Sequence, residues 1–299
     1  MRAVVYTEYG DPDVLSVGEV EEPHAERGQV RVAVRAASVN PIDWKIVSGA
    51  MSGADRPDGP SVPGSDAAGV VDEVGEGVTG VQVGDPVFGL GSGTAAEHAV
   101  LRAWAPKPPN VSFETAAGLG VTGETAVRVL DLLGLPEGRT VVVDGASGGV
   151  GIATVQVAVS RGLQVIGTSS PANADFVRSL GALHTPYGEG LTDRVRQIAP
   201  DGVDGAVDTA GRGSVRDLVA LTGDPGRVVT IADFGAAELG VQVTSGGGGG
   251  AARLAEVGAL VVQGRLQMPV EAVYPLDRAA EAYRRSREGH VRGKLVLAV

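Results

Sequence analysis

The stretch RTVVVDGASGGVGIATVQVAVSRGLQVIGTSS, residues 139–170, decides the fold of this 299-residue chain. Residues 141–143 form a short apolar β-branched run, which is typical of a buried parallel strand. Four glycines then crowd a turn, residues 152–159 carry an apolar helix, and residues 163–167 have the composition of a second strand. This order predicts a βαβ unit, in which the pyrophosphate of a dinucleotide binds at the N-terminus of the helix.

The glycine turn matches two motifs. As a G-x-G-x-x-G dinucleotide fingerprint, its three positions are Ala146, Gly148 and Gly151, so alanine replaces the first glycine. Residues 145–149 also spell G-x-S-x-G, the nucleophile elbow of the α/β-hydrolases, which likewise lies between a strand and a helix. A second strand-like segment follows the helix at the distance expected for a βαβ unit, which favours the dinucleotide interpretation. A turn that merely closes a βα unit is the remaining alternative.

A second glycine pattern is complete but stands in the wrong context. Gly75, Gly77 and Gly80 fit G-x-G-x-x-G at every position. The residues that follow, VQVGDPVFG (81–89), alternate like a strand and do not open a helix. Because no helix terminus is available there to bind a phosphate, we interpret this segment as a β-turn region.

Composition excludes several classes of protein. The net charge of −11 argues against nucleic acid as a partner. No apolar run reaches the ~20 residues of a membrane helix, and the first residues lack the apolar region of a signal peptide, so we expect a cytoplasmic protein with no membrane partner. The absence of cysteine excludes disulfides and thiolate metal sites. The histidines never stand three or four residues apart, so we expect surface side chains and not metal ligands at His24, His98, His184 and His290.

The chain divides by its secondary-structure pattern. Residues 1–112 contain strand-like segments separated by Pro- and Gly-rich connections, including a long loop at 50–63. Near residue 113 the pattern changes to helices alternating with strands, which predicts a parallel, doubly wound sheet, and Ser112 is suited to cap a helix that begins at Phe113. Residues 245–250, one serine and five glycines, predict a flexible loop. The last 30 residues predict one helix and a final strand that returns to the N-terminal part.

Several segments in a fixed order carry a family likeness: SVNPIDWKIVSG (38–49), PGSDAAGVVDEVGEGVTGVQVGDPVFG (63–89), AAGLGVTGETAV (116–127), VVDGASGGVGIATVQVA (142–158), DFVRSLGA (175–182), VDTAG (207–211), VVTIAD (228–233) and GKLVLAV (293–299). The chain resembles the zinc-independent quinone oxidoreductase group of the medium-chain dehydrogenase/reductase superfamily. The resemblance implies an α/β fold with a GroES-like β domain (1–112), a Rossmann domain (113–263) and a C-terminal return to the first domain (264–299). It also decides the motif ambiguity against a hydrolase.

The resemblance bears on metal chemistry. Zinc-dependent relatives have a cysteine where this chain has Asn40, and a histidine followed by glutamate where it has Ser65 and Asp66. Amide and hydroxyl groups are poor zinc ligands, so we expect no metal. Without a Lewis acid an alcohol is hard to oxidise, whereas an activated double bond is easily reduced.

The second strand of the βαβ unit indicates the cofactor. An NAD site usually has an acidic residue about 20 residues beyond the glycine turn, but here the strand ends in Thr168, Ser169 and Ser170. These hydroxyls leave room for a 2′-phosphate and predict NADPH. In NADPH-using relatives a lysine and a tyrosine join the serine; the matching positions are Asn173 and Tyr187, so the tyrosine is kept and the lysine is lost. Arg178 is a candidate substitute and, equally, a solvated helix arginine.

The glycine turn and the resemblance together define a set of predicted cofactor-binding residues: Thr122, Ala146, Ser147, Gly148, Gly149, Val150, Gly151, Ser169, Ser170, Asn173, Tyr187, Asp208, Thr209, Ala210, Ile231, Ala232, Asp233 and Lys294. On the substrate side, Asn40 is the predicted polar group beside the substrate, Asp43 is expected chiefly to hold the NPIDWK loop, and Lys45 is a candidate for an oxyanion contact. Trp44 stands where relatives often have a tyrosine, so the proton donor stays unassigned.

Three functions remain open at this point. The first is NADPH-dependent reduction of a quinone or an α,β-unsaturated carbonyl by hydride transfer. The second is a dedicated enoyl reductase that acts on a polyketide or acyl-thioester intermediate. The third is a non-catalytic protein that binds NADPH. The resemblance also implies a homodimer, for which Leu239–Thr244 is the expected edge strand.

Overall fold

The computed structural model describes residues 1–52, 54–246 and 248–299 of the chain. It divides into two compact units. Unit 1 comprises Met1–Val121, Gly250–Val262 and Met268–Val299, and unit 2 comprises Thr122–Gly249 and Gln263–Gln267. The predicted loops at 50–63 and 245–250 include residues 53 and 247, which lie outside the described ranges.

Unit 2 is built on the strands β7 Thr140–Asp144, β8 Gln164–Ser169, β9 Leu183–Pro186, β10 Gly205–Asp208, β11 Val228–Thr230 and β12 Gln242–Val243. Its helices are α4 Gly149–Ser160, α5 Ala174–Ser179, α6 Leu191–Ile198, α7 Val215–Thr222 and most of α3 Gly120–Leu133. The strand order is β12-β11-β10-β7-β8-β9, and every neighbouring pair is parallel. This is the doubly wound sheet that the alternation of strands and helices predicted.

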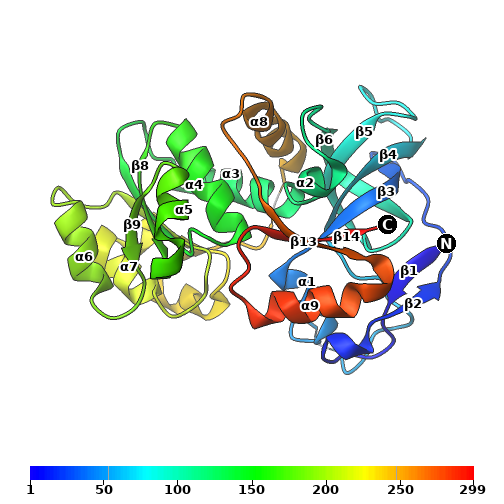
Figure 1. The fold of residues 1–299 in the computed structure, drawn as a ribbon, viewed down its shortest axis with the longest axis horizontal. Coiled ribbons are helices and arrows are strands. Elements are labelled where there is room, and N and C mark those ends of the chain that lie inside the picture. The colour runs from blue at the N-terminus through cyan, green and yellow to red at the C-terminus, as the bar shows by residue number, and fades with distance from the viewer. Residues whose placement is uncertain (53, 247) are drawn as a thin grey trace. The chain divides into compact units, whose positions relative to one another are not determined.

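The decisive stretch folds as predicted, into β7, α4 and β8. The three central valines of β7 are fully buried, as a strand covered on both faces requires. Val142 belongs to a core cluster that includes residues of α6 and α7, two helices that lie together at one side of unit 2 (Figure 1). The turn between β7 and α4 follows the last residue of a parallel strand, so it lies at the carboxyl edge of the sheet, where open α/β sheets bind their ligands.

Unit 1 contains the strands β1 Arg2–Val5, β2 Ser16–Glu19, β3 Val30–Val39, β4 Asp66–Val74, β5 Pro86–Ser92, β6 His98–Pro106, β13 Val270–Pro275 and β14 Lys294–Ala298. Its helices are α1 Pro41–Val47, α2 Phe113–Ala117, α8 Gly250–Val262 and α9 Ala279–Glu288. Six of these strands form one sheet in the order β13-β14-β3-β4-β5-β6, and β6 also pairs with β3. No helix in the described ranges has the length and the apolar character of a membrane span.

The C-terminal strand returns to the N-terminal part of the chain, as predicted: β14 pairs antiparallel with β3, with Leu295 opposite Val39 (Figure 1). Ser112 caps α2 at its predicted start, because its hydroxyl accepts a hydrogen bond of 3.3 Å from the backbone N–H of Thr115. The complete glycine fingerprint at residues 75–80 forms turns in which Gly77 and Gly80 have positive φ, and the chain continues from it into β5 and not into a helix.

The structure differs from the sequence prediction in three elements, and its two compact units divide the chain at positions other than 112/113 and 263/264. The predicted NPIDWK loop is the helix α1, because Asn40 and Asp43 stand at its N-cap and N3 positions with proline between them. Strands β2 and β13 were missed. Helix α8, expected in the Rossmann domain, belongs to unit 1, because it packs on β6 with Gly258 close to Phe88 and Pro106.

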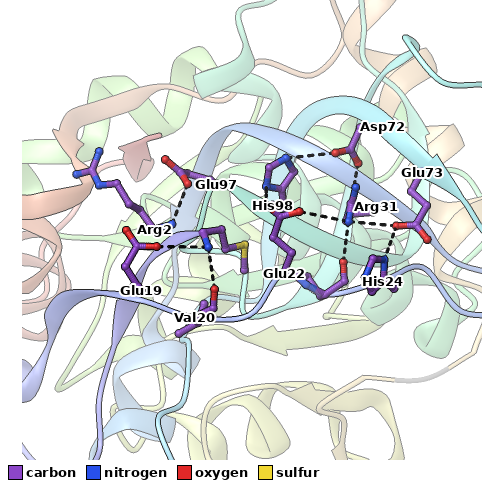
Figure 2. Close-up of polar contacts among 12 residues, drawn as sticks. Arg2, Glu19, Val20, Glu22, His24, Arg31, Asp72, Glu73, Glu97 and His98 are labelled. Atoms are coloured by element: carbon purple, nitrogen blue, oxygen red, sulfur yellow. Dashed lines mark hydrogen bonds and ion pairs between the residues drawn. The ribbon is translucent and has the colours of Figure 1, made fainter.

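A cluster of charged residues joins strands β3, β4 and β6 of unit 1 to the segment before β3 (Figure 2). Arg31 Nε donates to Asp72 at 3.1 Å, and its Nη1 contacts the carboxylates of Glu22 and Glu73 at 3.7 and 3.2 Å. His98 Nε2 lies 3.2 Å from the other oxygen of Asp72, and His24 Nδ1 lies 3.2 Å from Glu73. The cluster holds the segment that precedes β3 onto the sheet and occupies two of the four histidines with carboxylate partners.

Candidate functional site

The glycine turn of unit 2 has a geometry that few side chains permit. Gly145 has φ of 83°, and a Cβ there would lie 2.7 Å from Thr209 Oγ1. A Cβ on Gly151 would lie 2.1 Å from the carbonyl oxygen of Gly145, so glycine is required where α4 passes the turn. In contrast, a Cβ on Gly148 would meet only Gly145 O among the described residues, at 3.5 Å.

The N-terminus of α4 is suited to an anion. Gly148 is the N-cap residue, and no side chain of the described residues caps the helix. The first backbone N–H groups of a helix have no partner within the helix and carry the positive end of its dipole. Together with the open space at the Gly148 Cβ position, this cradle fits the pyrophosphate of a dinucleotide, and residues Ala146 to Gly151 form it.

The end of β8 carries hydroxyl groups and no carboxylate. Ser169 is the last residue of β8, and its Oγ donates to the carbonyl of Ser170 at 3.0 Å. Asn173 Nδ2 lies 3.3 Å from Ser147 Oγ and 3.4 Å from Ser170 Oγ, so its amide joins the glycine turn to the end of β8. Tyr187 follows directly on β9, whose residue Pro186 pairs with Ser169, and Tyr187 is 47% exposed.

The structure thus brings Ser147, Ser169, Ser170 and Asn173 together at one corner of the sheet, with Tyr187 on the neighbouring strand end. Arg178 does not have a free guanidinium, because its Nη1 pairs with Asp175 at 2.7 Å on the surface of α5. Burial lowers the pKa of His184 on β9, and a hydrogen bond with the backbone of Ser169 opposes that shift. His184 belongs to this corner as well, although its sequence pattern predicted only a surface side chain.

Two buried carboxylates lie side by side at the ends of β7 and β10. Asp144 and Asp208 are register partners, and Asp208 has no exposed surface. Asp208 Oδ1 accepts from the backbone N–H groups of Ala210 and Gly211, both at 2.9 Å, and Oδ2 accepts from Thr230 Oγ1 at 2.7 Å. Asp208 therefore holds the turn after β10 and directs both of its oxygens to the protein.

Asp144 is a residue that sequence reasoning missed. Its carboxylate accepts hydrogen bonds from Thr168 Oγ1 and, at 2.5 Å, from Ser214 Oγ. Burial raises the pKa of Asp144, and these two hydrogen bonds oppose the shift. Thr209 Oγ1 donates to the backbone carbonyl of Asp144 at 2.7 Å. In the sequence, the position of Asp144 directly before Gly145 was the only signal for this residue.

The remaining predicted residues of unit 2 are placed by backbone contacts. Thr230 Oγ1 accepts from the backbone N–H groups of Ala232 at 3.2 Å and Asp233 at 3.1 Å, and Ile231 N donates to Asp208 O at 3.1 Å. Segment 231–233 is therefore fixed beside the turn that follows β10. Thr122 is buried in α3.

Unit 1 contains a buried polar network centred on Asn40. Asn40 Nδ2 donates to Asp66 Oδ1 at 2.8 Å, and Asn40 Oδ1 accepts from Lys294 Nζ at 2.6 Å. Its backbone N–H donates to Asp43 Oδ2 at 2.7 Å, and Ser65 Oγ donates to Asp43 Oδ1 at 2.5 Å. Asn40 is 2% exposed, so its amide is held by protein partners on both sides.

Asp66 connects the network to the first turn of α3. Its Oδ2 accepts from the backbone N–H of Val121 at 2.6 Å, and its Oδ1 also accepts from Ser38 Oγ at 2.6 Å. A Cβ on Gly120 would lie 2.6 Å from Asp66 Cβ, so glycine allows this close approach. From the sequence, Asp66 was identified only as a replaced zinc position and Ser38 was missed; both lie within the segments that carry the family likeness.

The ionisable groups of the network shift one another. Burial raises the pKa of Asp43 to about 6; the hydrogen bond from Ser65 lowers it and the charge of Asp66 raises it. Burial also raises the pKa of Asp66, against the opposing charge of Lys294. Burial lowers the pKa of Lys294, against the charges of Asp66 and Asp43. One ammonium group thus faces two carboxylates in a buried region.

Two further predicted residues lie in unit 1. Lys294, predicted to bind the cofactor, is buried in unit 1 and donates to Val39 O at 3.2 Å as well as to Asn40. Lys45, the candidate for an oxyanion contact, makes no contact with the network among the described residues; its Nζ lies 5.7 Å from the centre of the Trp44 ring. Asp43 holds the start of α1, as its predicted structural role requires.

The donor set of this network does not fit a zinc ion. The positions that zinc-dependent relatives use hold an amide, a hydroxyl and a carboxylate, and the Lys294 ammonium group bonds directly to the amide oxygen. In the described ranges, no group of three or more His, Cys, Asp or Glu side chains is arranged to hold a metal.

A doubly wound unit with a glycine-rich anion cradle, joined in one chain to a β unit with a buried polar network, defines a nucleotide-dependent oxidoreductase of two units. Comparison with family models supports this class. Residues 26–127 match the alcohol dehydrogenase GroES-like domain, and residues 180–297 match the zinc-binding dehydrogenase family.

Individual relatives indicate which group of dehydrogenases and reductases the chain is similar to. A quinone oxidoreductase of Rattus norvegicus is 34% identical over 82% of this chain and 77% of the relative. An NADPH-dependent alkenal/one oxidoreductase of Arabidopsis thaliana is 32% identical over 99% of this chain and 79% of its own length. A polyketide synthase system protein of Streptomyces orinoci is 36% identical over 91% of this chain, which corresponds to 13% of that protein.

Among solved structures, a mycobacterial protein complexed with NADPH superposes with a TM-score of 0.87 at 27% identity, over the full length of both chains. The chain belongs to the quinone oxidoreductases of the medium-chain dehydrogenase/reductase superfamily, and it is an oxidoreductase. These relatives support an enzyme over the non-catalytic alternative that the sequence alone left open.

Proposed function

We propose that this protein reduces a quinone or an α,β-unsaturated carbonyl by hydride transfer from NADPH, without zinc. The related quinone and alkenal/one oxidoreductases support the class of reaction. NADPH supplies the hydride when it is bound, and the chain supplies binding, orientation and a site protected from water.

The observation that carries the cofactor assignment is the polar corner at the end of β8. A cofactor with a free 2′-hydroxyl is usually recognised by a carboxylate at this strand end. Here the strand ends in serines, and Asn173 bridges Ser170 to Ser147 of the glycine turn. A 2′-phosphate carries about two negative charges, which a carboxylate would repel and which hydroxyl and amide groups are able to bind.

On the substrate side we propose that Asn40 and Asp43 act through the network they share. Asn40 holds the Lys294 ammonium group at 2.6 Å, and Asp43 holds the Ser65 hydroxyl at 2.5 Å. The contact with Asn40 fixes a positive charge in a low-dielectric setting, where it stabilises developing negative charge better than solvent does. Lys45 lies apart from these groups, and we assign it no role.

The test is oxidation of the reduced cofactor, followed at 340 nm with a para-quinone, an ortho-quinone, an alkyl enone and an enoyl thioester. We expect turnover of a quinone or the enone, with kcat/KM at least tenfold higher for NADPH than for NADH. Equal or better kcat/KM with NADH contradicts the proposal that the polar corner at the end of β8 binds the 2′-phosphate of NADPH. Turnover of none of the four acceptors contradicts the proposed reaction.

One comparison favours a second candidate, a dedicated enoyl reductase for an acyl-thioester intermediate. The polyketide synthase system protein of Streptomyces orinoci aligns with 91% of this chain. Turnover of the enoyl thioester at a kcat/KM at least tenfold above that of the quinones and the simple enone supports this candidate and counts against the first.

A further inference from the structure

One arginine of unit 2 directs its hydrogen bonds to a single short segment. Arg194 projects from α6, and all three nitrogens of its guanidinium group donate to residues 185–189, which comprise the end of β9 and the loop after it. The acceptors and their distances are Thr185 Oγ1 at 3.3 Å, Pro186 O at 2.9 Å, Tyr187 O at 3.4 Å, Gly188 O at 3.3 Å and Glu189 O at 2.6 Å.

The partners of Arg194 are unusual for an arginine. Four are backbone carbonyls and one is a hydroxyl, and within the described part of the chain Arg194 forms no ion pair. Carbonyls of successive residues converge on one point only if the backbone turns around it. Gly188 and Gly190 have φ of 88° and 74°, the left-handed conformation that favours glycine, and they allow this turn. The guanidinium group therefore acts as the centre on which the loop is built.

The loop presents Tyr187 at the serine-rich corner at the end of β8. Tyr187 lies between two residues whose carbonyls bind Arg194, and its own carbonyl does so as well. Pro186 is the register partner of Ser169 on β8, so the backbone next to Tyr187 is fixed against the serine-rich strand end. Tyr187 remains 47% exposed, which leaves it available to a ligand.

We propose that Arg194 is a positioning residue for cofactor selectivity, and that it holds Tyr187 in place to contact the 2′-phosphate of NADPH. The proposal rests on the proposed function, because it requires that NADPH is the preferred cofactor. Arg194 acts through the loop and not by touching the phosphate, since its donors are already directed to the loop. A lysine cannot take its place, because an ammonium group lacks the planar set of donors.

The test uses two probes that need no turnover, adenosine 2′,5′-bisphosphate and adenosine 5′-monophosphate, with Kd measured by calorimetry. Their ratio isolates the contribution of the 2′-phosphate. For the wild type we expect the bisphosphate to bind at least tenfold more tightly. In R194M we expect this preference to fall at least fivefold, with Kd for the monophosphate changed less than twofold. In R194K the preference for the bisphosphate should fall as much as in R194M.

Two further variants separate positioning from a general structural role. Arg196 lies two residues further on α6, is exposed and donates a long hydrogen bond of 3.5 Å to Ala220 O, so R196M should keep the wild-type preference. In a Y187A background, R194M should change the preference no further, because Arg194 acts only through Tyr187. If R194M does not fold, R194Q is read in the same way.

The outcomes are distinguishable. A wild-type protein that binds both probes equally overturns the NADPH assignment together with this inference. A preference that Y187A lowers but R194M leaves intact overturns the inference alone. Equal weakening of both probes in R194M also overturns it, because that indicates only a structural role. If R194M lowers the preference for the bisphosphate as much in the Y187A background as in the wild type, the inference is overturned, because that result indicates a direct contact between Arg194 and the phosphate.

Discussion

Replacing Asp43 by asparagine should change how the stability of unit 1 depends on pH. Asp43 is buried in the network, and burial raises its pKa from 3.8 to about 6. A raised pKa in the folded state means that the native protein binds this proton more tightly than the unfolded chain. The carboxyl group therefore favours folding at low pH, and this contribution is lost as the pH rises from about 4 to about 6.

The size of the effect follows from the shift. A difference of roughly 2.2 pH units corresponds to about 3 kcal/mol over the whole titration. About 2 kcal/mol of this falls between pH 4.5 and 7.5, where the protein is conveniently studied. Asparagine keeps an acceptor for the Asn40 N–H and is able to bond the Ser65 hydroxyl, so D43N retains the start of α1 and removes only the titration.

The assay is urea unfolding, followed by tryptophan fluorescence at several pH values across this range. Both tryptophans, Trp44 and Trp104, lie in unit 1, so the signal reports on the unit that contains Asp43. We expect the stability of D43N relative to the wild type to increase by about 2 kcal/mol from pH 4.5 to 7.5. Asp66 also has a raised pKa, but it is present in both proteins and is largely removed by the comparison.

The control is D201N, because Asp201 is exposed, lies in unit 2 and forms no ion pair with another of the described residues. Its stability profile should run parallel to that of the wild type. Profiles of D43N and wild type that run parallel to within about 0.5 kcal/mol would refute the reasoning, since they would show that Asp43 does not hold its proton more tightly in the folded protein.

Three further predictions concern the sites and the assembly. N40A removes the 2.6 Å acceptor of Lys294 and the 2.8 Å donor to Asp66, so the free energy of unfolding should fall by about 2–3 kcal/mol and kcat at least about tenfold, with Kd for NADPH changed less than twofold. N173A should weaken NADPH binding and leave kcat nearly unchanged. An unchanged kcat in N40A removes Asn40 from the site. G151A places a Cβ 2.1 Å from Gly145 O and should cost about 2 kcal/mol or more, whereas G148A has space and should fold within about 1 kcal/mol of the wild type; equal stability of the two variants contradicts the close approach of α4 to the glycine turn. Strand β12 pairs with β11 and ends the sheet in the described part of the chain, so light scattering should give the mass of a dimer through this edge, and a monomeric mass at micromolar concentration contradicts the expected assembly.

The parts of the fold that sequence reasoning anticipated depend on local patterns. The run that became β7, α4 and β8 contains both strands and the turn within 32 residues, so periodicity and glycine spacing suffice. Helix α1 was also locally encoded, by the Asn-Pro-x-Asp spacing at its start, and was missed because its seven residues are too few for a helical period to be evident. Strand β13 was missed because it pairs in parallel with β14 and its residues alternate between exposed and half-buried positions.

The candidate site of unit 1 was anticipated only in part, and sequence separation explains the difference. The Asn40–Asp43 contact spans three residues and was within reach of a local argument. The contact of Lys294 with Asn40 spans 254 residues and exists because β14 pairs with β3, whose last residue precedes Asn40. Composition and spacing do not determine such a pairing. The same applies to Arg194, whose role is evident only once the carbonyls of the loop are seen around it.

The charged groups of the unit 1 network are buried at a cost to stability. Two carboxylates and one ammonium group lie out of contact with solvent, and replacement of such groups by apolar side chains of similar volume is often neutral or stabilising. The pKa values of Asp43 and Asp66 are raised and that of Lys294 is lowered, so burial opposes the charged form of all three groups. Part of the compensation for Asp66 comes from the Val121 N–H in the first turn of α3, where the helix dipole favours negative charge. An arrangement that opposes folding in this way is what we expect if Asn40, Asp43 and Lys294 take part in the proposed reaction.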